Sequence, residues 1–121
     1  MVKLVFCVTR RPEVQVDEFH RYWEEQHGPL VRSVAPVLEI RRYVQDHTLS
    51  TPVNDGLLAA RGAPVPFDGI AELWFDSVEA LVAASSTPEG RKAGTRLLED
   101  EGRFIDHGRS PLFLVSEVSI V

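Results

Sequence analysis

Hydrophobic residues follow two different periods along the chain. Apolar or β-branched alternating runs predict four strands, over residues 3–9, 37–47, 68–76 and 112–120. A helical period predicts an amphipathic helix over residues 16–27, with Val16, Phe19, Trp23 and His27 on one stripe. His27-Gly28-Pro29 should interrupt that helix, because the residue before a proline disfavours helical backbone, and a short helix over 29–34 follows.

The rest of the pattern predicts one long connection and two further helices. Residues 48–66 hold three prolines and two glycines, which favours a loop with at most a turn or two of helix over 55–61. Ser77 is a good cap for a helix over 78–85. Thr87-Pro88 then begins a helix that runs to about residue 103.

The predicted order is β-α-β-loop-β-α-β, which is typical of the ferredoxin-like α+β fold with a four-stranded antiparallel sheet. Helices in this plan cover one face of the sheet. The alternation is taken to leave five large or polar residues on the other face: Tyr43, Gln45, His47, Glu72 and Trp74. An uncovered face with a large aromatic needs a partner, so we expect a homodimer in which two sheets form an α/β barrel.

Composition narrows the function classes. The 121 residues fit a single domain, 1–121, and the net charge of −5 gives no electrostatic footprint for nucleic acid. Cys7 is the only cysteine and cannot form an internal disulfide. The apolar start of the chain is too short to span a membrane or to be a signal peptide. We therefore expect a cytoplasmic protein that uses neither nucleic acid nor membrane as a partner.

Two stretches resemble a known family. The run Phe19-His20-Arg21-Tyr22-Trp23, followed by His27-Gly28-Pro29-Leu30, is similar to the F-x-x-Y-W-x-x-x-H-G-P motif of the EthD family of dimeric α/β-barrel proteins. Residues 71–75 resemble that family's third strand, and residues 101–111 resemble the pattern before its last strand. The resemblance spans nearly the whole chain. It implies one EthD-like domain with a ferredoxin-like fold, and a homodimer.

The resemblance implies function only in outline, because members of the family are linked to ether degradation, polyketide tailoring and lactone isomerisation. Our first hypothesis is a cofactor-independent isomerase, cyclase or lyase that moves a proton beside the carbonyl of a small cyclic or aromatic compound. The second is a non-catalytic protein that binds a hydrophobic ligand or supports a partner oxygenase. A third is a haem enzyme, with His27 or His47 as the axial ligand. Whether any reaction is catalysed stays open.

Seven residues are candidates for the site. His27 and Tyr43 are the candidate catalytic residues, as proton shuttle and orienting donor, although His27 could instead cap the helix break and Tyr43 could lie at a dimer rim. Five others are candidates for substrate binding, each with a surface or interface role as the alternative: Arg41, Gln45, His47, Glu72 and Trp74.

No metal or nucleotide site is expected. No glycine-rich nucleotide loop, HExxH motif or nucleophile elbow is present. His20 and His27 lie two helical turns apart, about 10 Å along the axis, which is too far to share a metal ion. The acidic run Glu99-Asp100-Glu101 is interpreted as a solvated helix face. We therefore expect neither a metal nor a cofactor.

Overall fold

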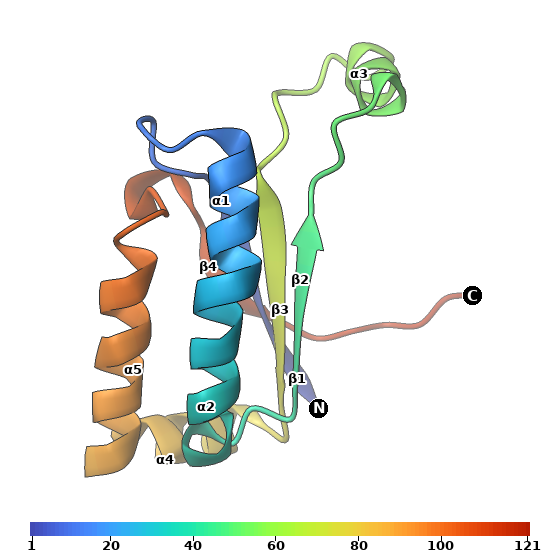
Figure 1. The fold of residues 1–121 in the computed structure, drawn as a ribbon. Coiled ribbons are helices and arrows are strands. Elements are labelled where there is room, and N and C mark those ends of the chain that lie inside the picture. The colour runs from blue at the N-terminus through green and yellow to red at the C-terminus, as the bar shows by residue number, and fades with distance from the viewer.

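The computed structural model describes residues 1–121 as an α+β fold (Figure 1). Its elements, in chain order, are β1 (Val2–Val8), α1 (Val16–Tyr22), the π-helix η1 (Trp23–His27), α2 (Gly28–Leu38), β2 (Arg42–His47), α3 (Pro52–Ala59), β3 (Gly69–Phe75), α4 (Val78–Ser86), α5 (Pro88–Glu101), the 3-10 turn η2 (His107–Arg109) and β4 (Leu112–Val115). The four strands form one sheet in the order β2-β3-β1-β4, with every neighbouring pair antiparallel. This order is the ferredoxin-like fold that the pattern predicted.

The helices α1, α2 and α5, with η1 between the first two, lie on one face of the sheet and leave the other open (Figure 1). The main core forms under α1 and η1, where Phe19 and Trp23 pack against strand residues and against Phe104 beyond α5. A second, smaller core joins α2 to α5 through Val34 and Ala93. This helix-covered layer is therefore where side chains are held most firmly, and it contains the polar groups described below.

The helix does not stop at His27-Gly28-Pro29, as the sequence had suggested. One turn widens instead, so that the Gly28 N–H bonds to the carbonyl of Trp23, five residues earlier. Proline inside an ordinary α-helix collides with the carbonyl four residues before it. The wider π-turn absorbs Pro29 without breaking the rod, and α1, η1 and α2 run on continuously (Figure 1).

The second strand begins later than predicted. Residues 37 and 38 belong to the end of α2, and Leu38 is buried against α5 rather than in the sheet. Glu39 closes the helix with a left-handed backbone (φ 55°), and the strand starts at Arg42. The apolar run from residue 37 therefore divided between the last helical turn and the strand, which periodicity alone does not separate.

Two segments project away from the body. Between β2 and β3 the predicted loop contains α3, which Thr51 caps and Pro52 begins, and none of its residues is buried. The last strand is shorter than predicted, ending at Val115, and residues 116–121 extend away from the sheet. In Figure 1 both α3 and this C-terminal segment lie on the side of the open face.

Candidate functional site

A groove runs along the edge of the helical layer, between α2 and β2. Its volume is about 400 Å³, which is within the usual range for small-molecule sites. Val31, Ala35 and Ile40 give it an apolar wall, and Tyr43 and Gln45 supply uncharged polar groups from the strand. Because β2 is an edge strand, the groove is open to solvent along one side. It is therefore a place where a small, partly apolar molecule can lie.

The π-turn prepares one end of this groove. The carbonyl of Trp23 accepts the Gly28 N–H and also the Nε2 of Gln45 at 2.8 Å. A Cβ at Gly28 would lie 3.5 Å from that same Nε2, so the helix comes into contact with the strand here. The widened turn thus ties η1 to β2 through a side-chain amide that lines the groove.

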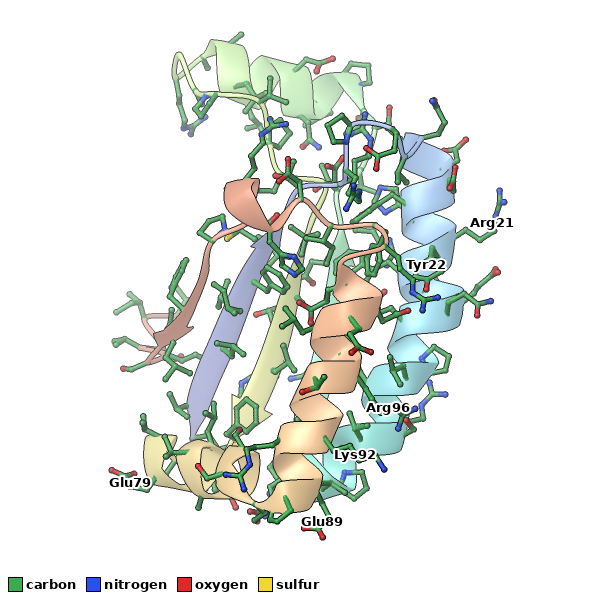
Figure 2. The ribbon with its side chains drawn as sticks, turned by 90° about the vertical axis from the view of Figure 1, so that its left-hand side faces the viewer. Arg21, Tyr22, Glu79, Glu89, Lys92 and Arg96 are labelled. Atoms are coloured by element: carbon green, nitrogen blue, oxygen red, sulfur yellow. The ribbon has the colours of Figure 1, made fainter.

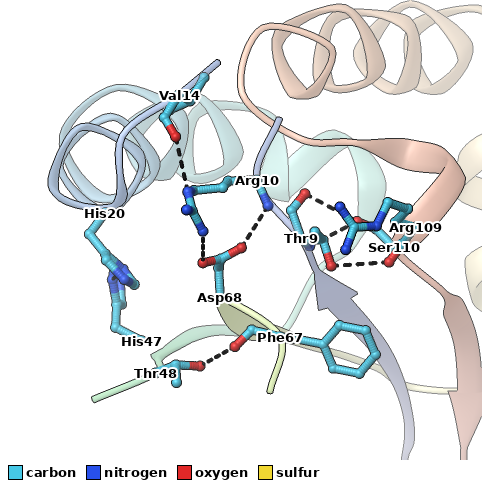
Figure 3. A network of polar contacts seen from close by, with 10 residues as sticks. All are labelled: Thr9, Arg10, Val14, His20, His47, Thr48, Phe67, Asp68, Arg109 and Ser110. Carbon is cyan, nitrogen blue, oxygen red and sulfur yellow. Dashed lines mark hydrogen bonds and ion pairs between the residues drawn. The ribbon is translucent and has the colours of Figure 1, made fainter. Parts of the chain in front are cut away.

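Polar side chains continue from Gln45 in both directions along β2. The Gln45 Nε2 donates to the Tyr43 hydroxyl oxygen at 2.8 Å, and the Gln45 Oε1 lies 2.9 Å from His47 Nε2. The His47 Nδ1 lies 2.7 Å from the Nδ1 of His20 on α1, and Figure 3 shows these two rings facing one another. The four side chains therefore form one continuous hydrogen-bonded chain, which we call the β2 chain.

Burial changes the acid–base behaviour of two members of the β2 chain. Burial raises the pKa of Tyr43 to about 12, so its hydroxyl keeps its hydrogen at neutral pH. The pKa of His47 is lowered, first by burial and then by the nearby charge of His20, with Glu24 acting in the opposite sense. Both groups are therefore held in their neutral forms near neutral pH.

His27 lies elsewhere in the helical layer, facing α5. Its side chain is buried, its Nδ1 is 2.7 Å from Asp100 Oδ2, and its ring packs on Phe104. The Tyr22 hydroxyl donates to the other oxygen of the same carboxylate, from the side of α1 that faces α5 (Figure 2). His27 does not line the groove that Tyr43 lines, so the structure does not bring the two predicted catalytic residues to one cavity.

Asp100 is a partner that the sequence interpretation missed. It was placed on a solvated helix face, but its side chain is 15% exposed and accepts two hydrogen bonds. The spacing contained the signal: Ala93, Leu97 and Asp100 lie three or four residues apart on α5, and the buried Phe104 follows four residues later, just beyond the helix. His20 was likewise missed as the partner of His47, because strand and helix residues 27 apart show no common period.

The face assignment of β2 was wrong. Tyr43 is paired with Leu73 and Gln45 with Ala71, so both point toward the helices, as does His47. Glu72 and Trp74 point to the opposite, open face. Polarity had suggested that the residues of β2 face outward. They face inward because the Trp23 carbonyl and His20 supply partners for their polar ends.

Glu72 and Trp74 belong to a charged cluster on the open face. Lys3 Nζ is 2.8 Å from Glu72 Oε1, and the Trp74 ring lies between the Lys3 ammonium at 5.1 Å and the Arg42 guanidinium at 4.6 Å. A hydrogen bond with Glu72 and, secondly, burial raise the pKa of Asp46 to about 6. The two residues predicted to bind substrate here are separated from the groove by the sheet itself.

Arg41 is held at the rim of the groove. It precedes β2 and pairs with Asp76 at 2.8 Å and more loosely with Glu39 at 3.4 Å. Another ion pair, between Arg10 and Asp68 at 2.8 Å, ties the end of β1 to the start of β3 (Figure 3).

No three or more His, Cys, Asp or Glu side chains are grouped so as to hold a metal ion. None of the helices has the length and apolar character needed to cross a membrane.

Comparison with known proteins identifies the family. The family model described as the EthD domain matches residues 11–108, which is most of the chain. The chain belongs to the EthD family. No curated protein matches the sequence.

Solved structures show the same fold. An EthD family protein from Bacillus halodurans is 23% identical with a TM-score of 0.65, and the match covers 98% of this chain and 99% of that one. An EthD-like protein from Ralstonia eutropha is 23% identical with a TM-score of 0.64, covering 98% and 92%. A protein of unknown function from Bacteroides fragilis, described as dimeric and ferredoxin-like, is 12% identical with a TM-score of 0.60, covering 96% and 95%.

Proposed function

We propose that this EthD protein is a cofactor-independent isomerase, cyclase or lyase that acts on a small cyclic or aromatic carbonyl compound, such as a lactone or a polyketide-type intermediate. The observation that carries the proposal is the arrangement of the Tyr43 hydroxyl. Its oxygen accepts a hydrogen bond from Gln45, so its own hydrogen is available to a ligand in the groove. The apolar wall can contact the rings of a carbonyl compound, and the Tyr43 hydroxyl can bond to its oxygen, beside the charged lining residues Glu24, Arg32, Arg41 and Arg42.

The proposed chemistry is proton transfer beside the carbonyl. Tyr43 donates a hydrogen bond to the carbonyl oxygen, and Glu24, the carboxylate on the groove lining, removes a proton from the adjacent carbon. The electron pair of that C–H bond then moves onto the oxygen as an enolate. Return of the proton to a different carbon gives an isomer and restores the carboxylate. Tyr43 remains protonated throughout, which agrees with its raised pKa.

His27, which the sequence suggested as the proton shuttle, has a different place in this proposal. It lines no part of the groove and shares the carboxylate of Asp100 with Tyr22. We propose that it acts on the groove indirectly, by fixing η1 against α5. The same turn supplies the Trp23 carbonyl that holds Gln45.

Exchange of carbon-bound hydrogen for deuterium tests the proposal without knowledge of the natural substrate. Unsaturated γ-lactones and aromatic β-diketones are incubated with the protein in D₂O, and loss of the proton signal beside the carbonyl is followed by NMR. Tyr43→Phe and Glu24→Gln should each slow exchange by about 10²–10⁴. Glu25→Gln is the matched control for Glu24→Gln, since Glu25 is an exposed carboxylate of the same turn and lies outside the groove. Equal exchange in Tyr43→Phe and wild type would refute the assignment.

A binding protein without chemistry is the second candidate. Tyr43 and Gln45 are neutral and mutually bonded, which is sufficient to orient a hydrophobic ligand for a partner oxygenase. In that case the compounds should shift the NMR signals of groove residues while no deuterium is incorporated over long incubation. The same experiment therefore separates the two candidates.

We also propose that the chain forms a homodimer through the open face of its sheet. Trp74 and Phe113 lie on that face, Phe113 is 48% exposed, and both α3 and residues 116–121 project to the same side (Figure 1). The dimeric protein from Bacteroides fragilis has this fold. Sedimentation at micromolar concentration should show a dimer, and Phe113→Glu should give a monomer. A monomeric wild type would refute the proposal.

A further inference from the structure

The direction of every hydrogen bond in the β2 chain follows from one backbone carbonyl. The Trp23 oxygen can only accept, so the Gln45 atom that contacts it at 2.8 Å must be the amide nitrogen. The amide oxygen therefore faces His47 and can only accept from it. As a result His47 must carry a hydrogen on Nε2, and in its neutral form its Nδ1 is an acceptor.

The same reasoning fixes His20. Two imidazole nitrogens 2.7 Å apart need one hydrogen between them, and the neutral His47 Nδ1 has none to give. His20 must then donate from its Nδ1. Aromatic rings pack against the pair: the ring centroids of Trp23 and His47 are 4.6 Å apart, and those of Phe19 and His20 are 5.1 Å apart. This packing holds the two imidazole rings in place relative to one another and favours the neutral form of His47.

At the other end of the chain the direction leads into the groove. Gln45 Nε2 gives its second hydrogen to the Tyr43 oxygen, and the Tyr43 hydrogen is left for a group outside the chain. Four donors in sequence thus point from α1 toward the groove. Hydrogen bonds aligned in this way polarise one another, which makes the last donor stronger than an isolated phenol.

We propose that His20, His47 and Gln45 are positioning residues that form a one-way relay, holding the Tyr43 hydroxyl as a donor toward ligands that present an anionic oxygen. An enolate or phenolate oxygen fits this donor, whereas a ligand that presents N–H or O–H meets a hydrogen already in place. The same lining has three arginines, Arg32, Arg41 and Arg42, against one carboxylate, Glu24, so its net charge also favours an anionic ligand. The inference rests on the proposed function for its site and names the ligand class for that site.

NMR of the histidine rings tests the relay directly on the unmodified protein. Long-range ¹H–¹⁵N spectra distinguish the two neutral tautomers, and the chain has four histidines, which His→Gln variants assign one by one. We expect hydrogen on Nε2 in neutral His47 and on Nδ1 in neutral His20. Hydrogen on Nδ1 of His47, or on Nε2 alone of neutral His20, would overturn the relay, whatever the protein catalyses.

Binding of two probes of similar shape tests the ligand class. 4-Nitrophenolate presents an anionic oxygen and 4-nitroaniline presents donors, and each is titrated against the protein by ¹⁵N NMR. Wild type should prefer the phenolate by about tenfold or more, the scale expected for one charge-assisted hydrogen bond. Equal affinities for the two probes would overturn the proposal.

Variants show whether the relay, and not only Tyr43, produces this preference. Gln45→Glu cannot donate to the Trp23 carbonyl or to Tyr43, so the Tyr43 hydroxyl turns to the new carboxylate and the preference should be lost. His47→Gln can still donate to Gln45 and should retain most of it, whereas His47→Leu should not. An unchanged preference in both Gln45→Glu and His47→Leu, each shown to be folded, would refute the relay.

The catalytic proposal and the hydrogen-bond relay can be refuted independently of each other. If wild type binds 4-nitrophenolate selectively and shows the expected tautomers but exchanges no deuterium, the catalytic proposal is wrong and the relay stands. If exchange occurs with the opposite tautomers, the relay is wrong and the catalytic proposal stands.

Discussion

Replacing Asp100 with asparagine tests whether the helical layer is anchored as the structure indicates. The change keeps the shape of the side chain and removes its charge and one acceptor oxygen. In the structure both carboxylate oxygens are used, one by His27 Nδ1 at 2.7 Å and the other by the Tyr22 hydroxyl. The asparagine amide can accept from only one of them, and its NH₂ group faces the other donor.

The expected loss follows from those two bonds. A hydrogen bond to a charged acceptor contributes about 1.5–3 kcal/mol to stability, and one of the two is lost in Asp100→Asn. Arg103 is 71% exposed and 3.8 Å away, so its attraction to the carboxylate adds little. We therefore expect the free energy of unfolding to fall by about 1.5–3 kcal/mol.

Urea unfolding followed by tryptophan fluorescence measures this loss. Glu99→Gln is the matched control: its side chain is exposed one position earlier in α5, and its stability should change by less than about 0.5 kcal/mol. Tyr22→Phe combined with Asp100→Asn should cost less than the sum of the single changes, because both change the same hydrogen-bonded group: without the Tyr22 hydroxyl, the asparagine oxygen can accept from His27 alone. Equal stability of the Asp100→Asn and Glu99→Gln proteins would refute the buried anchor.

Three other predictions concern stability and reactivity. Gly90→Ala places a Cβ against the Ala84 carbonyl oxygen and should lower the free energy of unfolding by about 3 kcal/mol or more. Gly94→Ala has no neighbouring atom within 4 Å of the new Cβ and should raise it by up to about 1 kcal/mol. Urea unfolding midpoints measure both changes. The pKa of Asp46 is about 6 in the folded protein against 3.8 in the unfolded chain, so its ionisation lowers the free energy of unfolding as pH rises from 4 to 6. We expect this decrease to be no more than about 1 kcal/mol, because Asp46 is a surface group. Asp46→Asn should make it smaller. The buried Cys7 thiol has a raised pKa and should react with a thiol reagent only at the rate of unfolding, so rapid reaction at pH 7 under native conditions would contradict its placement.

The fold could be predicted from sequence because its signals are local and agree with one another. Ser77 and Thr87 each accept a backbone N–H of the helix that follows, as their positions suggested. Alternation also separated the two faces within β3, where Ala71 and Phe75 are buried. Alternation could not show which face of one strand lies on the same side of the sheet as a given face of its neighbour, because that depends on the register between the strands.

The site was only partly predictable for the same reason. Tyr43, Gln45 and His47 were recognised as a set because they alternate on one strand. Their grouping with Glu72 was wrong. Glu72 is paired with Val44, and successive residues of a strand point to opposite faces, so Glu72 lies on the face opposite to Tyr43 and Gln45. His20 and Asp100 could be paired with their partners only after the helices were docked on the sheet.

One signal in the sequence nevertheless accounts for the π-turn from which the β2 chain is organised. Phe19, Trp23, His27 and Val31 are each four residues apart and all are buried. In a regular α-helix a step of four residues turns about 400°, so three such steps rotate the stripe by about 120° away from the core. A wider turn of five-residue hydrogen bonds between Trp23 and Gly28 takes up part of that rotation and keeps the stripe facing inward. The cost is an altered bonding pattern at the Trp23 carbonyl, and Gln45 of the adjacent strand uses that carbonyl as its acceptor. The four-residue spacing of these buried residues thus favours the π-turn. The π-turn in turn places the Trp23 carbonyl oxygen where it holds Gln45 on the lining of the groove.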